Sequence, residues 1–369
     1  MNQLFRWNQM GLFLLALAAG ILPFAVPEVC AAALREGLTL CSGPLLLSLF
    51  PFLVVSRLLV QCPESDLLAL PFRLAAWGIG IRTPCAARVL CIGFLGGFAP
   101  AASAAAQAVR TGQLTVEEAD ALLPACICSG PSFVVLTVGQ SLLGSAELGV
   151  LLFASQITAN YLTAALLNRF AGVRSVKPES AAPASPAPPR LDEILADAAI
   201  TYCKLCGFIL FFRMLAAGAG ALLPAGAGTL CAVLLEVCSG CDLASRTGRW
   251  GSLLCCAALS VQGLSVLLQV RTICPPEITL RPLYRSRLLH LPLSLALFYL
   301  LLPGGEVDVF STLPARVLLM RRVPPDCALL VFAVCCMAAC TLRSGIRQVE
   351  QKQMARNAGG CCINSKTLL

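Results

Sequence analysis

The stretch ALLPACICSGPSFVVLTVGQSLLGSA, from Ala121 to Ala146, decides what kind of protein this is. It holds no charged side chain and is long enough for one helix to cross a bilayer, which takes about 20 residues. Yet Pro124, Gly130–Pro131, Gly139 and Gly144 interrupt it. Such breaks free backbone groups that lipid cannot satisfy, so they are tolerated only inside protein or beside a water-filled cavity. The stretch therefore predicts a broken membrane segment next to an internal cavity.

The rest of the chain repeats this pattern of apolar stretches without charge. Of its 369 residues, 58% are hydrophobic and 12% are charged, whereas a soluble globular protein carries about 25% charged residues. The charge-free runs are Trp7–Pro27, Gly37–Ser56, Val89–Val109, Ala121–Ala146, Leu148–Asn168, Met214–Leu235, Trp250–Val270, Leu288–Gly305 and Cys327–Leu342. We therefore predict an all-helical, polytopic integral membrane protein with about eight to ten membrane segments, including re-entrant hairpins. A soluble enzyme, a disordered chain and a disulfide-stapled secreted domain are excluded.

One change in composition divides the chain. Residues 173–190 contain four prolines between Pro183 and Pro189, with Ser, Ala and scattered charge, which indicates a solvent-exposed linker. Basic residues in this linker and in the tail place both on the cytoplasmic side by the positive-inside rule. The predicted order is a first transmembrane helix (1–33), a first membrane repeat (34–172), the linker (173–190), a second membrane repeat (191–302), a last transmembrane region (303–342) and a basic cytoplasmic tail (343–369).

Charge and cysteine usage set further limits. The net charge of +8 is spread between the apolar runs, so it orients helices and indicates no nucleic-acid partner. Most of the 21 cysteines lie in apolar runs and pack as small hydrophobes, while the role of Cys361 and Cys362 stays open. His290 is the single histidine, and the chain has no Walker-type loop and no paired acidic motif. We expect no catalytic residues, no metal site, no cofactor and no enzymatic activity.

Two pairs of similar segments suggest an internal repeat. PFLVVSRLL at Pro51–Leu59 resembles GFILFFRML at Gly207–Leu215, and SGPSFVV at Ser129–Val135 resembles QGLSVLL at Gln262–Leu268. Glycine and proline also interrupt Met214–Leu235 in the second half. Interrupted helices at corresponding points of two halves indicate where a transporter binds its substrate. The pattern predicts a two-repeat, transporter-like architecture.

The polar residues at these interruptions are the candidate binding residues. Glu236 and Ser239, in LLEVCSG, follow an apolar run, and we predict a substrate or proton ligand there; the alternative is an interfacial acid at a helix end. Ser129, Gly130 and Ser132 mark a break followed by an apolar half-helix, whose N-terminus suits carboxylate or phosphate oxygens. The alternative is a tight turn whose serines bond their own backbone.

Amide and hydroxyl side chains on helix faces complete the candidate set. Gln262 and Ser265 share one face, with Gln269 further along, and Asn160 pairs with Gln156 in the first half. These groups either line a cavity or join helices by hydrogen bonds, and for Gln269 we favour the second role. Arg213 is expected to snorkel near a helix end, and His290 to lie at the interface.

Taken in order, these motifs resemble the YlbJ-type sporulation integral membrane proteins, whose core is the nucleoside-recognition Gate domain. The resemblance spans about 34 to 302, and its marks are FPFLVVSRLL at Phe50, GGFAP at Gly96, CSGPSFVV at Cys128, LLEVCSG at Leu234, QGLSVLLQ at Gln262 and YRSRLLH at Tyr284. It implies a fold related to the concentrative nucleoside transporters, with two hairpin-bearing repeats around a central site. It also adds Gly97 and Phe98, at the first break, to the candidate site.

The resemblance also implies a function and a location. The family is associated with passing dipicolinic acid, a small planar dicarboxylate, across the outer forespore membrane of a sporulating bacterium. Three polar positions of the family pattern are less polar here: Phe98 and Ala99 stand in the Gly-Tyr-Pro motif, Cys238 and Ser239 in the Glu-x-Thr-Asn-Gly motif, and leucine precedes Gln269. The substrate could therefore differ from that of the family.

Two other functions are kept as alternatives, one with the same fold and one without transport. The first is a transporter of a nucleoside or another small solute, and the second is a sporulation membrane scaffold that transports nothing. The expected partners are a small anionic solute, dipicolinate or nucleoside-like, and the lipid bilayer. A homo-oligomer stays open.

Overall fold

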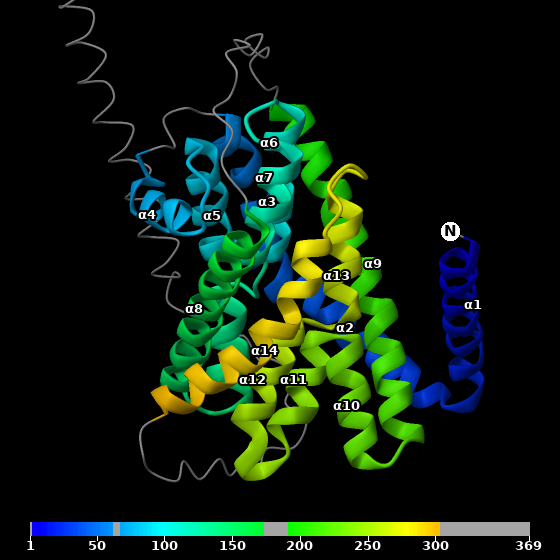
Figure 1. Cartoon of the computed structure of the whole chain (residues 1–369). Coiled ribbons are helices and arrows are strands. Elements are labelled where there is room, and N and C mark those ends of the chain that lie inside the picture. The colour runs from blue at the N-terminus through cyan, green and yellow to red at the C-terminus, as the bar shows by residue number, and fades with distance from the viewer. Residues whose placement is uncertain (1, 62–66, 173–190, 303–369) are drawn as a thin grey trace, which may run out of the picture.

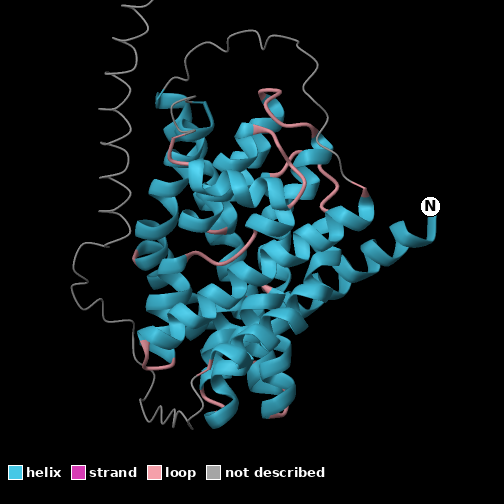
Figure 2. Cartoon of the chain, turned by 60° about the vertical axis from the view of Figure 1, so that its left-hand side comes forward, coloured by secondary structure: helices cyan, strands magenta, loops and turns pink. Residues whose placement is uncertain are grey.

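The computed structural model describes residues 2–61, 67–172 and 191–302, and within these ranges the chain forms helices and no strand. The expected linker (173–190), last transmembrane region (303–342) and tail (343–369), with Cys361 and Cys362, lie outside the described residues. Figure 2 shows helices through nearly all of the described chain. The prediction of an all-helical fold is confirmed for this part of the protein.

The elements before the linker begin with three apolar helices and continue with a series of shorter ones. They are α1 (Asn2–Ala25), α2 (Pro27–Ser42), α3 (Pro44–Gln61), α4 (Leu70–Gly78), α5 (Pro84–Gly96), α6 (Phe98–Arg110), α7 (Val116–Cys126), the π-helix η2 (Ser132–Leu142) and α8 (Ala146–Ala171). After the linker come α9 (Leu191–Leu222), α10 (Ala225–Leu235), α11 (Val237–Ser245), η3 (Gly248–Trp250), α12 (Gly251–Val261), α13 (Gly263–Ile273) and α14 (Arg281–Leu301).

Three helical segments of the described chain are long and apolar enough to cross a membrane. They are α8, α9 and the segment Gly248–Ile273, which joins η3, α12 and α13. A fourth span arises if Leu15–Ala25 and Pro27–Ser42, bent by 109° at Pro27, count together. Shorter apolar helices accompany them at Leu49–Val60, Pro84–Gly96, Ser132–Leu142 and Gly226–Leu235. These lengths and compositions are those of an integral membrane protein.

Local sequence explains where several helices begin and end. Thr115 caps α7: its side chain accepts from the N–H of Glu118, whose carboxylate accepts in return from the N–H of Thr115. Ser145 caps α8 by accepting from Leu148, and Gly172 ends that helix in the left-handed conformation. The Thr115–Glu118 pair also fixes α5, because Thr83 donates to Glu118 at 2.5 Å.

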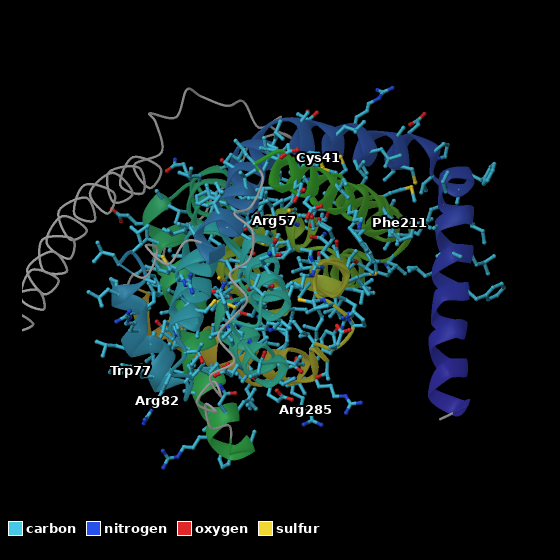
Figure 3. All side chains as sticks on the ribbon, turned by 90° about the horizontal axis from the view of Figure 1, so that it is seen from above. Cys41, Arg57, Trp77, Arg82, Phe211 and Arg285 are labelled. Carbon is cyan, nitrogen blue, oxygen red and sulfur yellow. The ribbon has the colours of Figure 1, made fainter. Side chains whose placement is uncertain are left out.

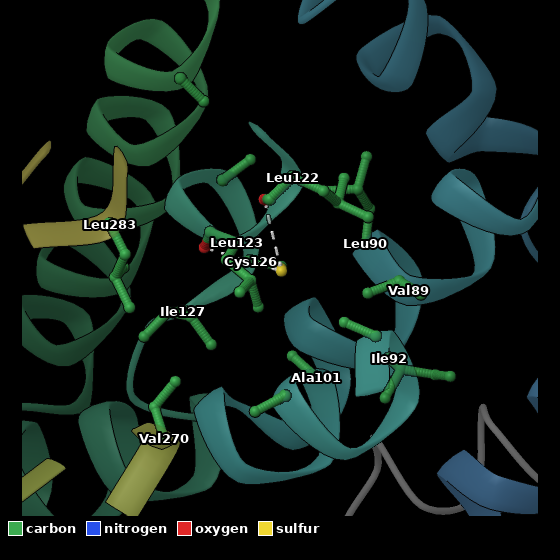
Figure 4. Packing of buried hydrophobic residues seen from close by; sticks show 14 of the residues in the cluster. Val89, Leu90, Ile92, Ala101, Leu122, Leu123, Cys126, Ile127, Val270 and Leu283 are labelled. Carbon is green, nitrogen blue, oxygen red and sulfur yellow. Dashed lines mark hydrogen bonds between the residues drawn. The ribbon is translucent and has the colours of Figure 1, made fainter. Parts of the chain in front are cut away.

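The core lies among the short helices of the first half. Helices α5, α6 and α7 are buried on nearly all sides, and α6 achieves this with a run of alanines from Ala99 to Ala108. Figure 4 shows Ile92 of α5, Ala101 of α6 and Leu123 of α7 in one buried cluster, which also includes Val270 of α13. A helix that is apolar all round belongs in an interior. The small residues of α6 let the neighbouring backbones approach closely.

Longer helices surround this core. Helix α8 packs against η2 and α14, α9 packs against α2 and α10, and α3 packs against α6. Figure 1 shows α1 standing at one side of the body and joined to it through α2. The arrangement places four interrupted segments, α5–α6, α7–η2, α10–α11 and α12–α13, within the bundle.

Candidate functional site

Three of the four interrupted segments break where the sequence predicts an interruption. The fourth, α12–α13, does not, because Gln262 was expected within a helix on the same face as Ser265. The α5–α6 break is Gly97, with φ 81° and ψ −163°, and the α7–η2 break runs from Ile127 to Pro131. The α10–α11 break is Glu236, whose backbone is extended at φ −150° and ψ 125°. The α12–α13 break is formed by Gln262 and Gly263, with φ of 64° and 68°.

The first two breaks cross at a backbone-to-backbone contact. A Cβ atom on Gly97 would lie 2.7 Å from the nitrogen of Gly130 and 3.2 Å from the carbonyl oxygen of Cys128. No side chain fits in that space, and the positive φ of Gly97 is itself a region that favours glycine. Gly97 therefore allows the α5–α6 break to rest on the α7–η2 break.

The last two breaks cross in the same manner. A Cβ atom on Gly263 would lie 3.0 Å from the nitrogen of Glu236 and 3.0 Å from the carbonyl group of Leu235. The α12–α13 break thus rests on the α10–α11 break, as Gly97 rests on Gly130. In both halves a glycine with positive φ is the point of contact between two broken helices.

A cavity of ≈ 50 Å³ lies between these crossings. Its glycine and polar wall comprises Gly96, Ser129, Gly130, Ser132, Glu236, Cys238 and Gln269. Its apolar wall comprises Leu45, Leu49, Phe98, Phe133, Ile209, Val237 and Val266. Five of the ten residues chosen from the sequence therefore line one cavity: Phe98, Ser129, Gly130, Ser132 and Glu236.

Glu236 fills the N-terminus of α11 with its own carboxylate. Its Oε1 accepts from the backbone N–H of Cys238 at 2.8 Å, and its Oε2 accepts from the N–H of Ser239 at 2.7 Å. The hydroxyl of Ser239 donates to the same Oε2 at 2.8 Å. The glutamate is 2% exposed. A buried carboxylate held by three donors and the helix dipole is well stabilised as a structural cap.

The opposite helix N-terminus carries no such cap. The residue before η2 is Pro131, which makes no side-chain capping bond, and Ser132 and Phe133 begin the helix at the cavity wall. The first N–H groups of a helix have no partner within it. The cavity thus lies between one helix N-terminus that holds a built-in carboxylate and another without a side-chain cap, where the N–H of Val134 donates to the carbonyl oxygen of Gly130 at 3.0 Å.

The other five predicted residues lie around the cavity and do not line it. Ser239 bonds Glu236, and Gly97 forms the first crossing. The side chain of Ser265 accepts from Gln269 at 3.0 Å, and Gln262 is a buried residue of the second crossing. Asn160, fully buried, donates to the carbonyl oxygen of Ile127 at 3.4 Å. These groups hold the breaks in place.

A buried cation lies directly behind the α7–η2 break. Arg287 of α14 is 8% exposed and donates to the side-chain oxygen of Asn160 at 3.1 Å and to the backbone oxygen of Ser260 at 3.5 Å. No carboxylate of the described chain pairs with it. Because Asn160 bonds Ile127, this guanidinium is linked through one side chain to the break. An uncompensated cation in a low-dielectric interior favours a nearby anion.

One expectation from the sequence was wrong. His290 is not exposed at an interface: it is 1% exposed, and its Nε2 lies 3.2 Å from the carbonyl oxygen of Gln156. Helices α8 and α12 pack against its helix α14 and bury it. Arg213 pairs at 2.6 Å with Glu36 of α2, whose side chain is exposed, and the snorkelling of its guanidinium stays a prediction.

Several cavity residues were missed or given a different role. Gln269 was expected to join helices, but its amide donates to Ser265 on the same helix, α13. Within the described residues its Oε1 has no partner, and the residue lines the cavity. The apolar wall, including Leu45 of α3 and Ile209 of α9, carries no sequence signal, since any membrane helix contains such residues.

Comparisons with known proteins identify no relative. No protein-family model matches the chain. Searches of curated proteins and of solved structures find no significant match either.

Proposed function

We propose that this chain is a membrane transporter that moves a small anionic solute without ATP hydrolysis, and that it is not an enzyme. The observation that carries the proposal is the cavity where broken helices meet inside a membrane protein. Backbone irregularity at membrane depth is costly unless it lines a cavity, and interrupted helices supply the ligand contacts of many transporters.

The wall of the cavity favours an anion. The start of η2 at Ser132, which has no side-chain cap, places the positive end of a helix dipole at this wall. Arg287 adds a buried positive charge behind the same break. The resemblance to YlbJ-type sporulation proteins makes dipicolinic acid the first candidate, and the outer forespore membrane the proposed location.

Glu236 sets a condition on that substrate. Its carboxylate occupies the N-terminus of α11, so a dianion such as dipicolinate would meet a like charge across the cavity. When the substrate carboxylate takes over the donors that hold Glu236, the carboxylate of Glu236 loses its stabilisation and can be protonated, which removes that repulsion. We therefore propose that Glu236 carries a proton together with the anion.

The cavity must widen for binding. Its ≈ 50 Å³ is far below the volume of small-molecule sites, about 300–1,000 Å³. The two crossings, Gly97 on Gly130 and Gly263 on Glu236, are alike in their geometry, which supports a two-repeat architecture of about eight to ten membrane segments with re-entrant hairpins. Movement of one repeat against the other would open the cavity to each side in turn.

A nucleoside is the second candidate substrate. The carboxylate of Glu236 and the unpartnered Oε1 of Gln269 are acceptors, and a neutral solute rich in N–H and O–H donors would satisfy them. Such a solute needs no protonation of Glu236.

Uptake of labelled dipicolinate by proteoliposomes that contain the purified protein tests the proposal. Saturable uptake that excess uridine and adenosine leave intact supports the anion. Uptake of labelled uridine that adenosine blocks and dipicolinate does not affect would show that the substrate is a nucleoside and not the anion. Absence of flux for both solutes under every ion gradient, in folded protein, would overturn transport.

A further inference from the structure

A second and larger cavity, of ≈ 160 Å³, lies away from the helix breaks. We call it the basic chamber. Its wall is built from the C-terminal parts of α3, α6 and α13 and from the N-terminal part of α9. These parts gather at the upper end of the molecule in Figure 1, where α9 begins.

The length of α9 allows the chamber to lie at the edge of a hydrocarbon layer. Helix α9 has 32 residues, which corresponds to about 48 Å at about 1.5 Å per residue. This exceeds the thickness of a hydrocarbon core, about 30 Å. The chamber wall uses the charged N-terminal part of α9, from Asp197 to Lys204, and this is the part that can extend into water.

The charges of the chamber wall are unequal. Three cationic side chains, Arg57, Arg110 and Lys204, face the chamber, against one acid, Asp197. Arg57 is bound to that acid by an ion pair and also donates to the hydroxyl of Thr201 at 3.4 Å. Neither Arg110 nor Lys204 forms an ion pair with any residue that the structure describes. Two unneutralised cations therefore remain at one concave surface.

Figure 3 views the molecule from this end. Arg57 lies within the body of the bundle, whereas Arg82 and Arg285 lie at its periphery. The side chain of Arg57 is 12% exposed and that of its partner Asp197 is 58% exposed, so the ion pair extends from the wall of the chamber to its surface. Arg110 and Lys204 are exposed.

One residue belongs to both cavities. Gln269 of α13 lines the basic chamber and also the cavity at the helix breaks. It is 2% exposed, and its Oε1 has no hydrogen-bond partner in the part of the chain that the structure describes. A buried, unpartnered polar atom between two cavities is the point at which a polar solute or water passing from one to the other would find an acceptor.

We infer that the basic chamber is a second binding site, for the carboxylate or phosphate group of a small soluble anion. Arg110 and Lys204 supply the attraction, the Arg57–Asp197 pair shapes the wall, and Gln269 separates this site from the cavity at the breaks. A concave surface of one sign concentrates ligands of the opposite sign. Its role as the loading site of a transporter rests on the proposed function, whereas binding itself does not.

Equilibrium binding tests the inference without transport. The full chain in phosphatidylcholine nanodiscs is titrated with labelled dipicolinate and, separately, with labelled inorganic phosphate. The double variant Arg110→Gln, Lys204→Gln should weaken binding by about 5–10-fold at low salt, and less at high salt. The matched control, Arg82→Gln with Arg285→Gln, removes the same charge from exposed positions outside the chamber and should change binding by less than about twofold.

Each outcome decides one assignment. Equal loss in both double variants, or no binding of either probe, overturns the chamber as a site. Loss of binding when half of the lipid is replaced by phosphatidylglycerol shows a lipid-headgroup site and overturns the soluble anion. Binding that Glu236→Gln abolishes and the chamber variant leaves unchanged also overturns the chamber, while the proposed function stands. Binding at the chamber without any flux in proteoliposomes supports the chamber as a binding site and overturns the proposed transport function.

Discussion

Replacement of Gly97 by alanine would test whether the helix breaks are held together as the structure describes. The backbone at Gly97 has φ 81° and ψ −163°, a region that is essentially restricted to glycine. The added Cβ would also lie 2.7 Å from the nitrogen of Gly130. The substitution therefore combines backbone strain with a clash between two backbones, and no flexible side chain can relieve that clash.

The expected cost follows from these two terms. The backbone term is about 1–3 kcal/mol, and forcing a methyl group into a filled interior costs about 1–3 kcal/mol more. Gly97→Ala should therefore lower the free energy of unfolding by about 2–6 kcal/mol. Gly112 provides the control, because its φ is also positive, at 69°, but no atom of the described residues lies within 4 Å of its Cβ position. Gly112→Ala should cost only about 1–2 kcal/mol.

Thermal unfolding of the detergent-solubilised variants, followed by tryptophan fluorescence, measures the difference. The midpoint of Gly97→Ala should fall clearly below that of Gly112→Ala, and Gly263→Ala should resemble the former because its Cβ would lie 3.0 Å from the nitrogen of Glu236. If Gly97→Ala and Gly112→Ala unfold at the same temperature, the two breaks do not rest on each other, and the cavity between them loses its support.

Three further substitutions probe the caps and the polar contacts. Glu236→Gln keeps the side-chain size but removes the charge that three donors hold. The substitution should cost about 1–2 kcal/mol of stability and make uptake independent of pH. A pH profile of uptake equal to that of the wild type would show that Glu236 is not the proton carrier. Asp120→Asn weakens the bonds that the carboxylate accepts from Thr279 and Leu280 and should lower stability by about 2 kcal/mol, measured by the unfolding midpoint. Thr115→Ala removes the cap of α7 and should cost about 1 kcal/mol, with no change in anion binding.

The positions of the helix breaks could be predicted from the sequence, because they depend on local chemistry. Gly130–Pro131 and Glu236 each interrupt an apolar run, and each begins or precedes a new helix in the structure. These interruptions can be interpreted locally because lipid offers no hydrogen-bond partners, so an irregular backbone must lie inside protein or beside a water-filled cavity. The same local signal identified Ser129 and Ser132 as cavity residues.

The pairing of the breaks could not be predicted, because it depends on contacts distant in sequence. Nothing near Gly97 indicates that it rests on Gly130, nor anything near Gly263 that it meets Glu236. Asn160 has the residue type of a ligand-binding group, yet it holds the carbonyl oxygen of Ile127.

The burial of His290 could not be predicted from the sequence either. His290 lies close to charged residues in sequence, which is typical of an interface, but the packing of α8 and α12 around α14 encloses it. Gln269 shows the same limit for a polar residue that lines cavities. Its spacing on α13 identifies the face that it shares with Ser265, and only the fold shows that this face meets two cavities.

The most direct test of the central claim is flux of labelled dipicolinate into proteoliposomes, compared between the wild-type chain and Glu236→Gln. The account predicts saturable uptake by the wild type, stimulated by an inward proton gradient and insensitive to uridine, and uptake by the variant that no longer responds to the gradient. Uptake that is absent in folded wild-type protein, or that is identical in both proteins at every pH, would contradict it.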